Sequence, residues 1–154
     1  MKLLVDSREK WTQSNSSDVH LRKYFEKHSI EYEVRKLDVG DYQLEGNPGI
    51  SVDRKQSMEE ISRNLLNKSD SSRFWKEVRR AHDQHIKLVV LIESGPAVLN
   101  INQVAKWRSK YSGAYGRNLI DVMIRLECAY GVTFKFCSKK STAKAILDIL
   151  TEGH

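Results

Sequence analysis

Three groups of charged residues stand out in the first 55 residues of the sequence. Asp6, Arg8 and Glu9 follow one short apolar run, Asp53 and Lys55 follow another, and Asp41 follows a glycine. A carboxylate at the end of a hydrophobic strand costs free energy unless it has a partner or a function. Two converging carboxylates with a lysine beside one of them are the parts of a magnesium-dependent site that cleaves phosphodiester bonds. This pattern predicts a nuclease.

Phosphodiester hydrolysis needs an activated water and neutralisation of the charge on the phosphorus oxygens, and Mg²⁺ supplies both. We expect Asp41 and Asp53 to bind the metal if their strands pair as a hairpin. Strand alternation places Asp53 and Lys55 on one side and Arg54 on the other. Nearby carboxylates favour the charged form of Lys55, so we expect an electrostatic role rather than that of a general base. From spacing alone, a solvated hairpin with surface ion pairs remains open.

The composition is that of a globular protein with a preference for polyanions. The chain has 154 residues, 40% of them apolar and 30% charged, with a net charge of +6 and a pI of about 9.3. This length fits one domain, and the basic charge favours nucleic acid as partner. The longest apolar run, residues 88–92, is too short to span a membrane. Two cysteines and an acid at position 6 indicate an intracellular protein with no disulfide framework and no signal peptide.

Hydrophobic periodicity predicts both strands and helices. Strands are expected over residues 3–5, 31–37, 41–44, 50–54, 87–93 and 132–137, and helices over residues 18–28, 57–67, 73–83, 102–109, 118–130 and 141–150. Asp18, Ser57 and Ser141 are the expected N-caps, with Glu60 completing a capping box. Residues 31–54 read as antiparallel strands, residues 12–17 as a mobile loop and residues 68–72 as a polar connection. The order predicts a three-layer α/β domain.

Basic residues concentrate in two stretches. Arg73, Lys76 and Arg80 recur at helical spacing and therefore share a face. The second stretch interleaves Lys106, Arg108, Lys110 and Arg117 with Trp107, Tyr111 and Tyr115. Aromatic rings among basic residues stack on unpaired bases, although we expect Trp107 to belong to the core. Both stretches are candidate DNA-binding surfaces.

Several segments resemble the nuclease domain of the XPF family of structure-specific endonucleases. They are Asp6-Ser7-Arg8-Glu9, Gly40-Asp41-Tyr42, residues 52–59 (Val-Asp-Arg-Lys-Gln-Ser-Met-Glu), Ser72-Arg73-Phe74, Leu91-Ile92-Glu93 and Tyr130-Gly131-Val132. The family motif is Gly-Asp, a variable gap, Glu-Arg-Lys, three residues and Asp. The resemblance covers nearly the whole chain in order, so it implies that residues 1–154 form one XPF-type nuclease domain.

The resemblance also implies a fold and an activity. The fold is restriction-endonuclease-like, of the PD-(D/E)xK type, with a central mixed sheet flanked by helices in three layers. The implied activity is Mg²⁺-dependent cleavage of branched DNA, such as forks, flaps or junctions, in repair or recombination. Mn²⁺ is expected to substitute for Mg²⁺. Asp41 and Asp53 are placed as metal ligands and Lys55 as the catalytic lysine, with Asp6, Arg8 and Glu9 as further site residues. The family's nuclease domains commonly pair, which implies a homodimer or heterodimer; the apolar face of residues 118–130 offers a surface for it or belongs to the core.

The sequence departs from the family pattern in two respects. Asp53 stands where the family has Glu, and Glu59 stands where it has Asp. The tandem helix-hairpin-helix module of many relatives does not follow the nuclease motifs within the 154 residues. Two alternatives stay open: a non-catalytic nucleic-acid-binding or scaffold partner of a nuclease, and an RNA-cleaving relative.

Overall fold

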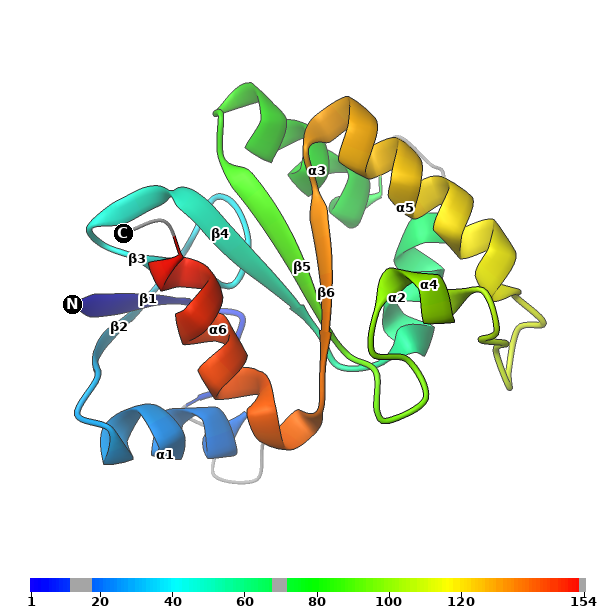
Figure 1. Cartoon of the computed structure of the whole chain (residues 1–154). Coiled ribbons are helices and arrows are strands. Elements are labelled where there is room, and N and C mark those ends of the chain that lie inside the picture. Colours follow the sequence, from blue (N-terminus) through cyan, green and yellow to red (C-terminus); the bar gives the residue numbers. More distant parts are fainter. Residues whose placement is uncertain (12–17, 68–71, 153–154) are drawn as a thin grey trace.

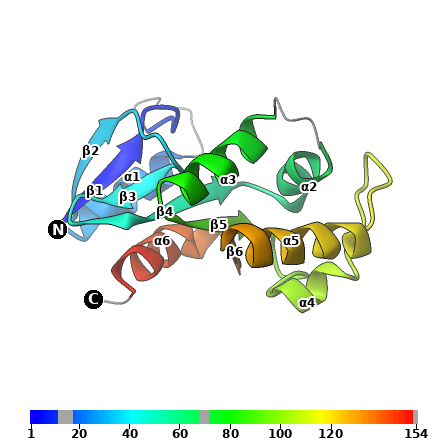
Figure 2. The same cartoon turned by 90° about the horizontal axis from the view of Figure 1, so that it is seen from above.

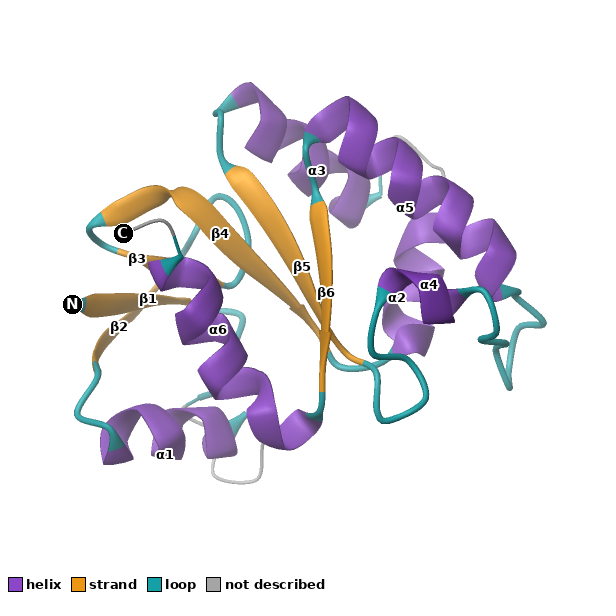
Figure 3. Ribbon diagram, viewed as in Figure 1, coloured by secondary structure: helices purple, strands orange, loops and turns teal. Residues whose placement is uncertain are grey.

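A six-stranded sheet with helices on both faces forms the fold (Figures 1 and 3). The computed structural model describes residues 1–11, 18–67 and 72–152. Its strands are β1 (Lys2–Asp6), β2 (Glu31–Arg35), β3 (Tyr42–Leu44), β4 (Asn47–Lys55), β5 (Lys87–Glu93) and β6 (Thr133–Cys137). Its helices are α1 (Val19–Lys27), α2 (Met58–Leu66), α3 (Arg73–Asp83), α4 (Ile101–Val104), α5 (Gly116–Tyr130) and α6 (Thr142–Thr151), with a 3₁₀ turn at Lys139–Ser141.

The sheet is mixed, with strand order β2-β1-β3-β4-β5-β6 and with β3 antiparallel to both of its neighbours. The expected pairing of β3 and β4 as a hairpin is confirmed. The expectation that residues 31–54 form one antiparallel run is wrong, because β2 pairs in parallel with β1 instead. Strand β1 is buried from Leu3 to Asp6 and therefore lies inside the sheet, whereas β2 alternates Glu31, Glu33 and Arg35 and forms an edge.

Two hydrophobic layers sandwich the sheet, as the three-layer prediction requires. Helices α2, α3, α4 and α5 pack on the face that carries Leu88, Val90 and Ile92 of β5. Helices α1 and α6 pack on the opposite face, against Val89 and Leu91, because successive strand residues point to opposite sides. Figure 1 shows α1 and α6 together at one side of the sheet and the other helices across it.

The apolar side of α5 belongs to the core. Leu119, Val122, Met123 and Leu126 are buried in the layer that α5 forms with α2 and α3. Of the two uses that the sequence left open for this face, the structure supports packing within the chain. Pairing of two nuclease domains therefore stays a prediction with no support from these four side chains.

Helix ends differ from the sequence prediction in instructive ways. Ser57 caps α2 as expected, accepting a hydrogen bond from the backbone N–H of Glu60 at 3.1 Å. Asp18 precedes α1 but makes no side-chain cap, because its carboxylate binds Arg54 and the Lys10 backbone N–H. Ser141 stands at the expected N-cap position of α6 but makes no side-chain cap there, because its hydroxyl bonds to the Ser138 backbone within the 3₁₀ turn.

Other boundaries shift by a few residues. Strand β4 begins at Asn47 rather than residue 50, and the helix predicted over residues 102–109 is only the single turn α4. The predicted loop at residues 12–17 lies outside the described residues, as does most of the connection at residues 68–72. Among the described residues, no helix is both long enough and apolar enough to cross a bilayer.

The topology brings the chemically active segments to one edge of the sheet. Because β1, β4 and β5 run in the same direction and β3 runs against them, the carboxyl ends of these three strands meet the start of β3. Asp6, Asp53 and Glu93 lie at or near those ends, and Asp41 immediately precedes β3. The N-terminus and the C-terminal end of α6 lie toward the opposite edge in Figures 1 and 2.

Candidate active site

Gly40 and Asp41 lie directly before β3, where the chain packs closely against β4. Gly40 has φ +72°, and a Cβ there would lie 2.1 Å from Ser51 Oγ and 2.9 Å from the Val52 carbonyl oxygen, so only glycine fits. Asp41 then donates its backbone N–H to the Val52 carbonyl at 2.7 Å, and its Oδ2 accepts the Arg54 N–H at 2.9 Å. The Gly-Asp pair thereby fixes the Asp41 carboxylate beside the end of β4.

Asp41 and Asp53 are neighbouring carboxyls in a poorly hydrated place. Burial, followed by repulsion from Asp53 and Glu9, raises the pKa of Asp41 well above its ordinary value, and the Arg54 N–H only partly opposes this. Asp53 is 4% exposed, and it repels both Asp41 and Glu77. Repulsion among buried carboxyls costs free energy, and a bound cation would offset it.

Lys55 lies on the same side of β4 as Asp53, which confirms the predicted alternation. Its Nζ is 3.2 Å from Asp53 Oδ2 and 3.9 Å from Glu60 Oε1, and it stands 5.2 Å from the centroid of the Phe74 ring. Burial disfavours the charge of Lys55, but attraction to Asp53 and Glu60 outweighs it and raises the pKa of the amine. The surroundings of Lys55 therefore favour its positively charged form.

Two further acids join this cluster. Burial raises the pKa of Glu77 on α3 to about 8, and repulsion from Asp53 adds to the effect. Burial likewise raises the pKa of Glu9 to about 7, although a hydrogen bond to Tyr42 and the charge of Arg54 oppose it. Glu9 was predicted from the sequence. Glu77 was not, because a single acid among the basic residues of α3 carries no spacing signal.

These side chains line an open pocket of about 290 Å³, which we call the carboxylate pocket. Its walls are formed by Arg8, Glu9, Asp41, Asp53, Arg54, Lys55, Gln56, Glu60, Asn64, Arg73, Phe74 and Glu77. A second pocket of about 480 Å³, the basic pocket, shares three of these residues and is lined by Ser7, Arg8, Lys36, Leu37, Asp38, Arg73, Lys76, Glu77 and Arg80. The predicted common face of Arg73, Lys76 and Arg80 is thus confirmed.

Asp6 and Arg8 act as a pair at the junction of the two pockets. Asp6 is fully buried; its Oδ1 accepts the Leu37 N–H at 2.8 Å, and its Oδ2 accepts both the backbone N–H and the Nε–H of Arg8. Asp6 is not among the described residues that line either pocket, whereas Arg8 lines both. The structure thus places Asp6 behind Arg8, as the residue that orients its guanidinium group.

Arg54 anchors a buried ion-pair network on the other side of β4. Its guanidinium group lies 2.7 Å from Glu93, 2.5 Å from Asp18 and 3.7 Å from Glu9, and the Arg54 side chain is 1% exposed. Glu93 also accepts a hydrogen bond from Thr142 of α6 at 2.9 Å. This network connects the ends of β4 and β5 with α1 and α6, and it holds Glu9 at the edge of the carboxylate pocket.

The second basic stretch lies apart from both pockets. Lys106, Arg108 and Lys110 are exposed on the segment between α4 and α5, and none is among the described residues that line the two pockets. Glu59 turns toward this segment and accepts the Ser109 hydroxyl at 2.7 Å. Its neighbour Glu60 faces the carboxylate pocket instead.

The donor set of the carboxylate pocket fits a hard divalent cation. Asp41 and Asp53 offer clustered carboxylate oxygens that repel one another. Within residues 1–11, 18–67 and 72–152, no group of three or more His, Cys, Asp or Glu side chains has the geometry of a complete metal site. A cation held by these two aspartates would complete its coordination with water, as Mg²⁺ commonly does.

Comparison with known proteins places the chain in a family. The chain matches the model of the ERCC4 domain over residues 5–149. It is similar in structure to XPF from Aeropyrum pernix (TM-score 0.69, 20% identity, 97% of this chain and 63% of that chain) and to XPF from Aeropyrum pernix in complex with DNA (0.65, 19%, 97% and 62%).

The chain spans less than two thirds of the length of these structural relatives, and at this identity the likeness shows a shared fold, that of the restriction-endonuclease-like XPF nuclease domain. No curated protein sequence matches the chain. The family model, in contrast, covers most of the 154 residues, including every residue of the carboxylate pocket. The chain belongs to the ERCC4 domain family.

Proposed function

We propose that this chain is a divalent-metal-dependent endonuclease that hydrolyses phosphodiester bonds in branched DNA, as in repair or recombination. The observation that carries the proposal is the meeting of Asp41, Asp53 and Lys55 in the carboxylate pocket, where repulsion from Asp53 adds to burial in raising the pKa of Asp41. Membership of the ERCC4 domain family supports it. So does the DNA complex of a structurally similar XPF, although that complex is a property of the relative.

In this proposal Asp41 and Asp53 hold Mg²⁺, or Mn²⁺ in its place. The cation supplies Lewis acidity toward the phosphate and a water of lowered pKa. Lys55 stays charged between Asp53 and Glu60 and stabilises negative charge on the phosphorus oxygens in the transition state. Clustered carboxylates repel one another in the absence of a cation. Binding of the metal to this pocket would remove that repulsion.

The basic pocket receives the DNA backbone. Arg8 and Arg73 line both pockets, so a strand with its scissile phosphate near Asp53 continues directly onto positive charge. Lys36 and Lys76 extend this charge. Arg80 is held in place by donating a hydrogen bond at 2.6 Å to the Asp38 carbonyl oxygen. Phosphate contacts of this kind position a nucleic acid without reading its sequence.

The proposal is tested by incubating labelled fork, flap, four-way junction and plain duplex DNA, and RNA of matched sequence, with the protein in Mg²⁺ or Mn²⁺. An Asp53→Ala variant and an EDTA reaction run in parallel. Metal-dependent cutting of branched DNA that the variant lacks would support the proposal. Binding of every DNA without cutting by the native protein would instead indicate a non-catalytic partner of a nuclease, and preferential cutting of matched RNA would indicate an RNA-cleaving relative.

A further inference from the structure

The segment between α4 and α5 folds into a short hairpin, residues 107–116, referred to below as the 107–116 hairpin. The Ser109 N–H donates to the Ala114 carbonyl at 2.9 Å, and the Gly116 N–H donates to the Trp107 carbonyl at 2.8 Å. Ser109 Oγ accepts the N–H groups of two residues of the turn, at 3.0 and 3.1 Å. The shape of the turn is therefore set by its own hydrogen bonds.

The base of this hairpin is fixed against the protein. Trp107 packs against the core layer formed by α2, α3 and α5. Gly116 lies so close to α4 that a Cβ would stand 1.6 Å from the Val104 carbonyl oxygen. A glycine in such contact leaves no room for the hairpin to slide along α4.

Glu59 joins the hairpin to the helix that borders the carboxylate pocket. Its Oε2 accepts the Ser109 hydroxyl at 2.7 Å and its Oε1 accepts the Lys110 N–H at 3.1 Å. Glu59 stands four residues after Lys55 and directly before Glu60, which lines the pocket. The first turn of α2 thus connects the 107–116 hairpin with the residues proposed to cleave the phosphodiester bond.

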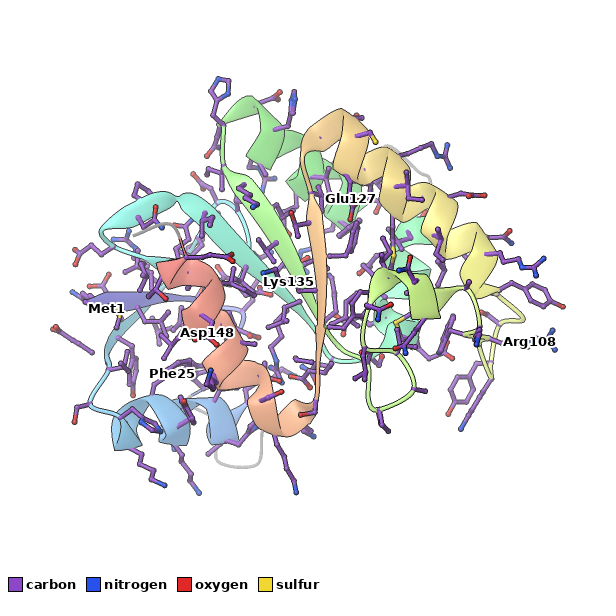
Figure 4. The ribbon with its side chains drawn as sticks, viewed as in Figure 1. Met1, Phe25, Arg108, Glu127, Lys135 and Asp148 are labelled. Atoms are coloured by element: carbon purple, nitrogen blue, oxygen red, sulfur yellow. The ribbon has the colours of Figure 1, made fainter. Side chains whose placement is uncertain are left out.

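The outer surface of the hairpin carries positive charge and an exposed aromatic ring, that of Tyr111. Lys106, Arg108, Lys110 and Arg117 are all exposed, and Figure 4 shows Arg108 at the outer edge of the molecule on this segment. Arg108 covers the Tyr115 ring at 4.6 Å. Tyr111 is 85% exposed, and among the described residues no ring or cation stacks on it.

We propose that the 107–116 hairpin binds an unpaired nucleotide of the DNA substrate, with Tyr111 stacked on its base and the basic residues beside it on the phosphates. The inference rests on the proposed nuclease function and adds a site for single-stranded DNA, connected to the carboxylate pocket through the first turn of α2. An unpaired base is the fitting ligand because bases within a duplex are already stacked on both sides, whereas a free base gains a stacking partner. Glu59 is the positioning residue that keeps this site at a fixed place relative to Lys55.

The test measures DNA binding by fluorescence anisotropy in Ca²⁺, with a fork that carries 2-aminopurine at its first unpaired position and with a matched plain duplex. Stacking on an aromatic ring contributes about 1–3 kcal/mol per base, so Tyr111→Ala should weaken fork binding by about 5- to 150-fold. Duplex binding should change less than about twofold. Tyr111→Phe keeps the ring and should retain the fork affinity. Leu99→Ala removes another exposed side chain, 60% exposed and outside the hairpin, and should leave both affinities unchanged.

The spectroscopic signal separates stacking from a general loss of affinity. Native protein and Tyr111→Phe should quench the 2-aminopurine fluorescence when they bind the fork. Fork DNA that is fully bound by Tyr111→Ala should keep its fluorescence. Glu59→Ala should weaken fork binding in the same sense, since it releases the hairpin. Unchanged fork affinity in Tyr111→Ala, or an equal loss for fork and duplex, would overturn the inference while leaving the nuclease proposal intact. Absence of metal-dependent cleavage by the native protein would instead refute the nuclease proposal, and with it this inference.

Discussion

Replacing Glu77 with glutamine should make the metal-free protein less sensitive to rising pH. Burial and the neighbouring Asp53 raise the pKa of Glu77 from 4.5 to about 8. The folded state therefore retains a proton that the unfolded state has already released. Unfolding free energy must fall as pH rises from about 4.5 to about 8, because in this window the native state binds more protons than the unfolded chain. The amide of the Glu77→Gln variant does not titrate, so the variant lacks this contribution.

The size of the effect follows from the two pKa values. Each pH unit inside the window costs about 1.36 kcal/mol for one such carboxyl. Near pH 5 the Glu77 carboxyl is only partly ionised in the unfolded state, so the change in unfolding free energy per pH unit is below this value. By pH 7 nearly the full value of about 1.36 kcal/mol per unit applies. Between pH 5 and pH 7, the native protein should lose about 2–3 kcal/mol more unfolding free energy than Glu77→Gln does.

The assay is urea unfolding in EDTA at half-unit steps between pH 5 and pH 8, followed by circular dichroism. Glu127→Gln, at an exposed position of α5 labelled in Figure 4, is the matched control and should follow the native curve. Mg²⁺ should restore stability above pH 7 in the native protein, since a bound cation neutralises the acids of the carboxylate pocket. Parallel curves for native protein and Glu77→Gln would refute the reasoning that Glu77 is held among like charges.

Further predictions concern three other groups of the site. Lys55→Gln should lower the single-turnover cleavage rate by about 10²- to 10³-fold with DNA affinity changed little, because one electrostatic donor is lost; a loss confined to DNA affinity would argue against this role. Arg54→Met should destabilise the fold by about 3–5 kcal/mol in urea unfolding, since the acids around Arg54 become unpaired charges; a change below about 1 kcal/mol would show that they are hydrated. Lys36→Gln and Lys76→Gln should each reduce the slope of log affinity against log salt by about 0.9 in anisotropy titrations, and unchanged slopes would place the DNA backbone elsewhere.

Local patterns in the sequence predicted strand β4 well. The alternation of Asp53, Arg54 and Lys55 depends only on the two-residue period of a strand, and the structure places them as that period requires. The pairing of β3 with β4 follows from a short turn between two apolar segments. Gly40 belongs to the Gly-Asp motif of the sequence. The reason that a glycine is required there is the close approach of Ser51, which depends on the pairing of β3 with β4.

Contacts between residues far apart in the chain could not be predicted from the sequence. Glu77 reaches Asp53 from a helix 24 residues later, and its neighbours in sequence resemble a solvated basic face. Asp18 had the sequence context of a helix cap, but the buried Arg54 competes successfully for its carboxylate. Asp6 was predicted as an acid of the site, whereas its hydrogen bonds commit it to Leu37 and Arg8. In each case a partner from another element decides the role of the side chain.

The most direct test of the proposed catalytic centre is the single-turnover rate of fork cleavage by native protein and Asp41→Asn, measured across a Mg²⁺ titration. The native rate should rise with Mg²⁺ and saturate. Asp41→Asn should lose at least about 10³-fold in rate while binding the fork as tightly or more tightly, because one negative charge beside the phosphate is removed. An Asp41→Asn rate equal to the native rate at saturating Mg²⁺ would contradict the claim that the carboxylate pocket is the catalytic centre.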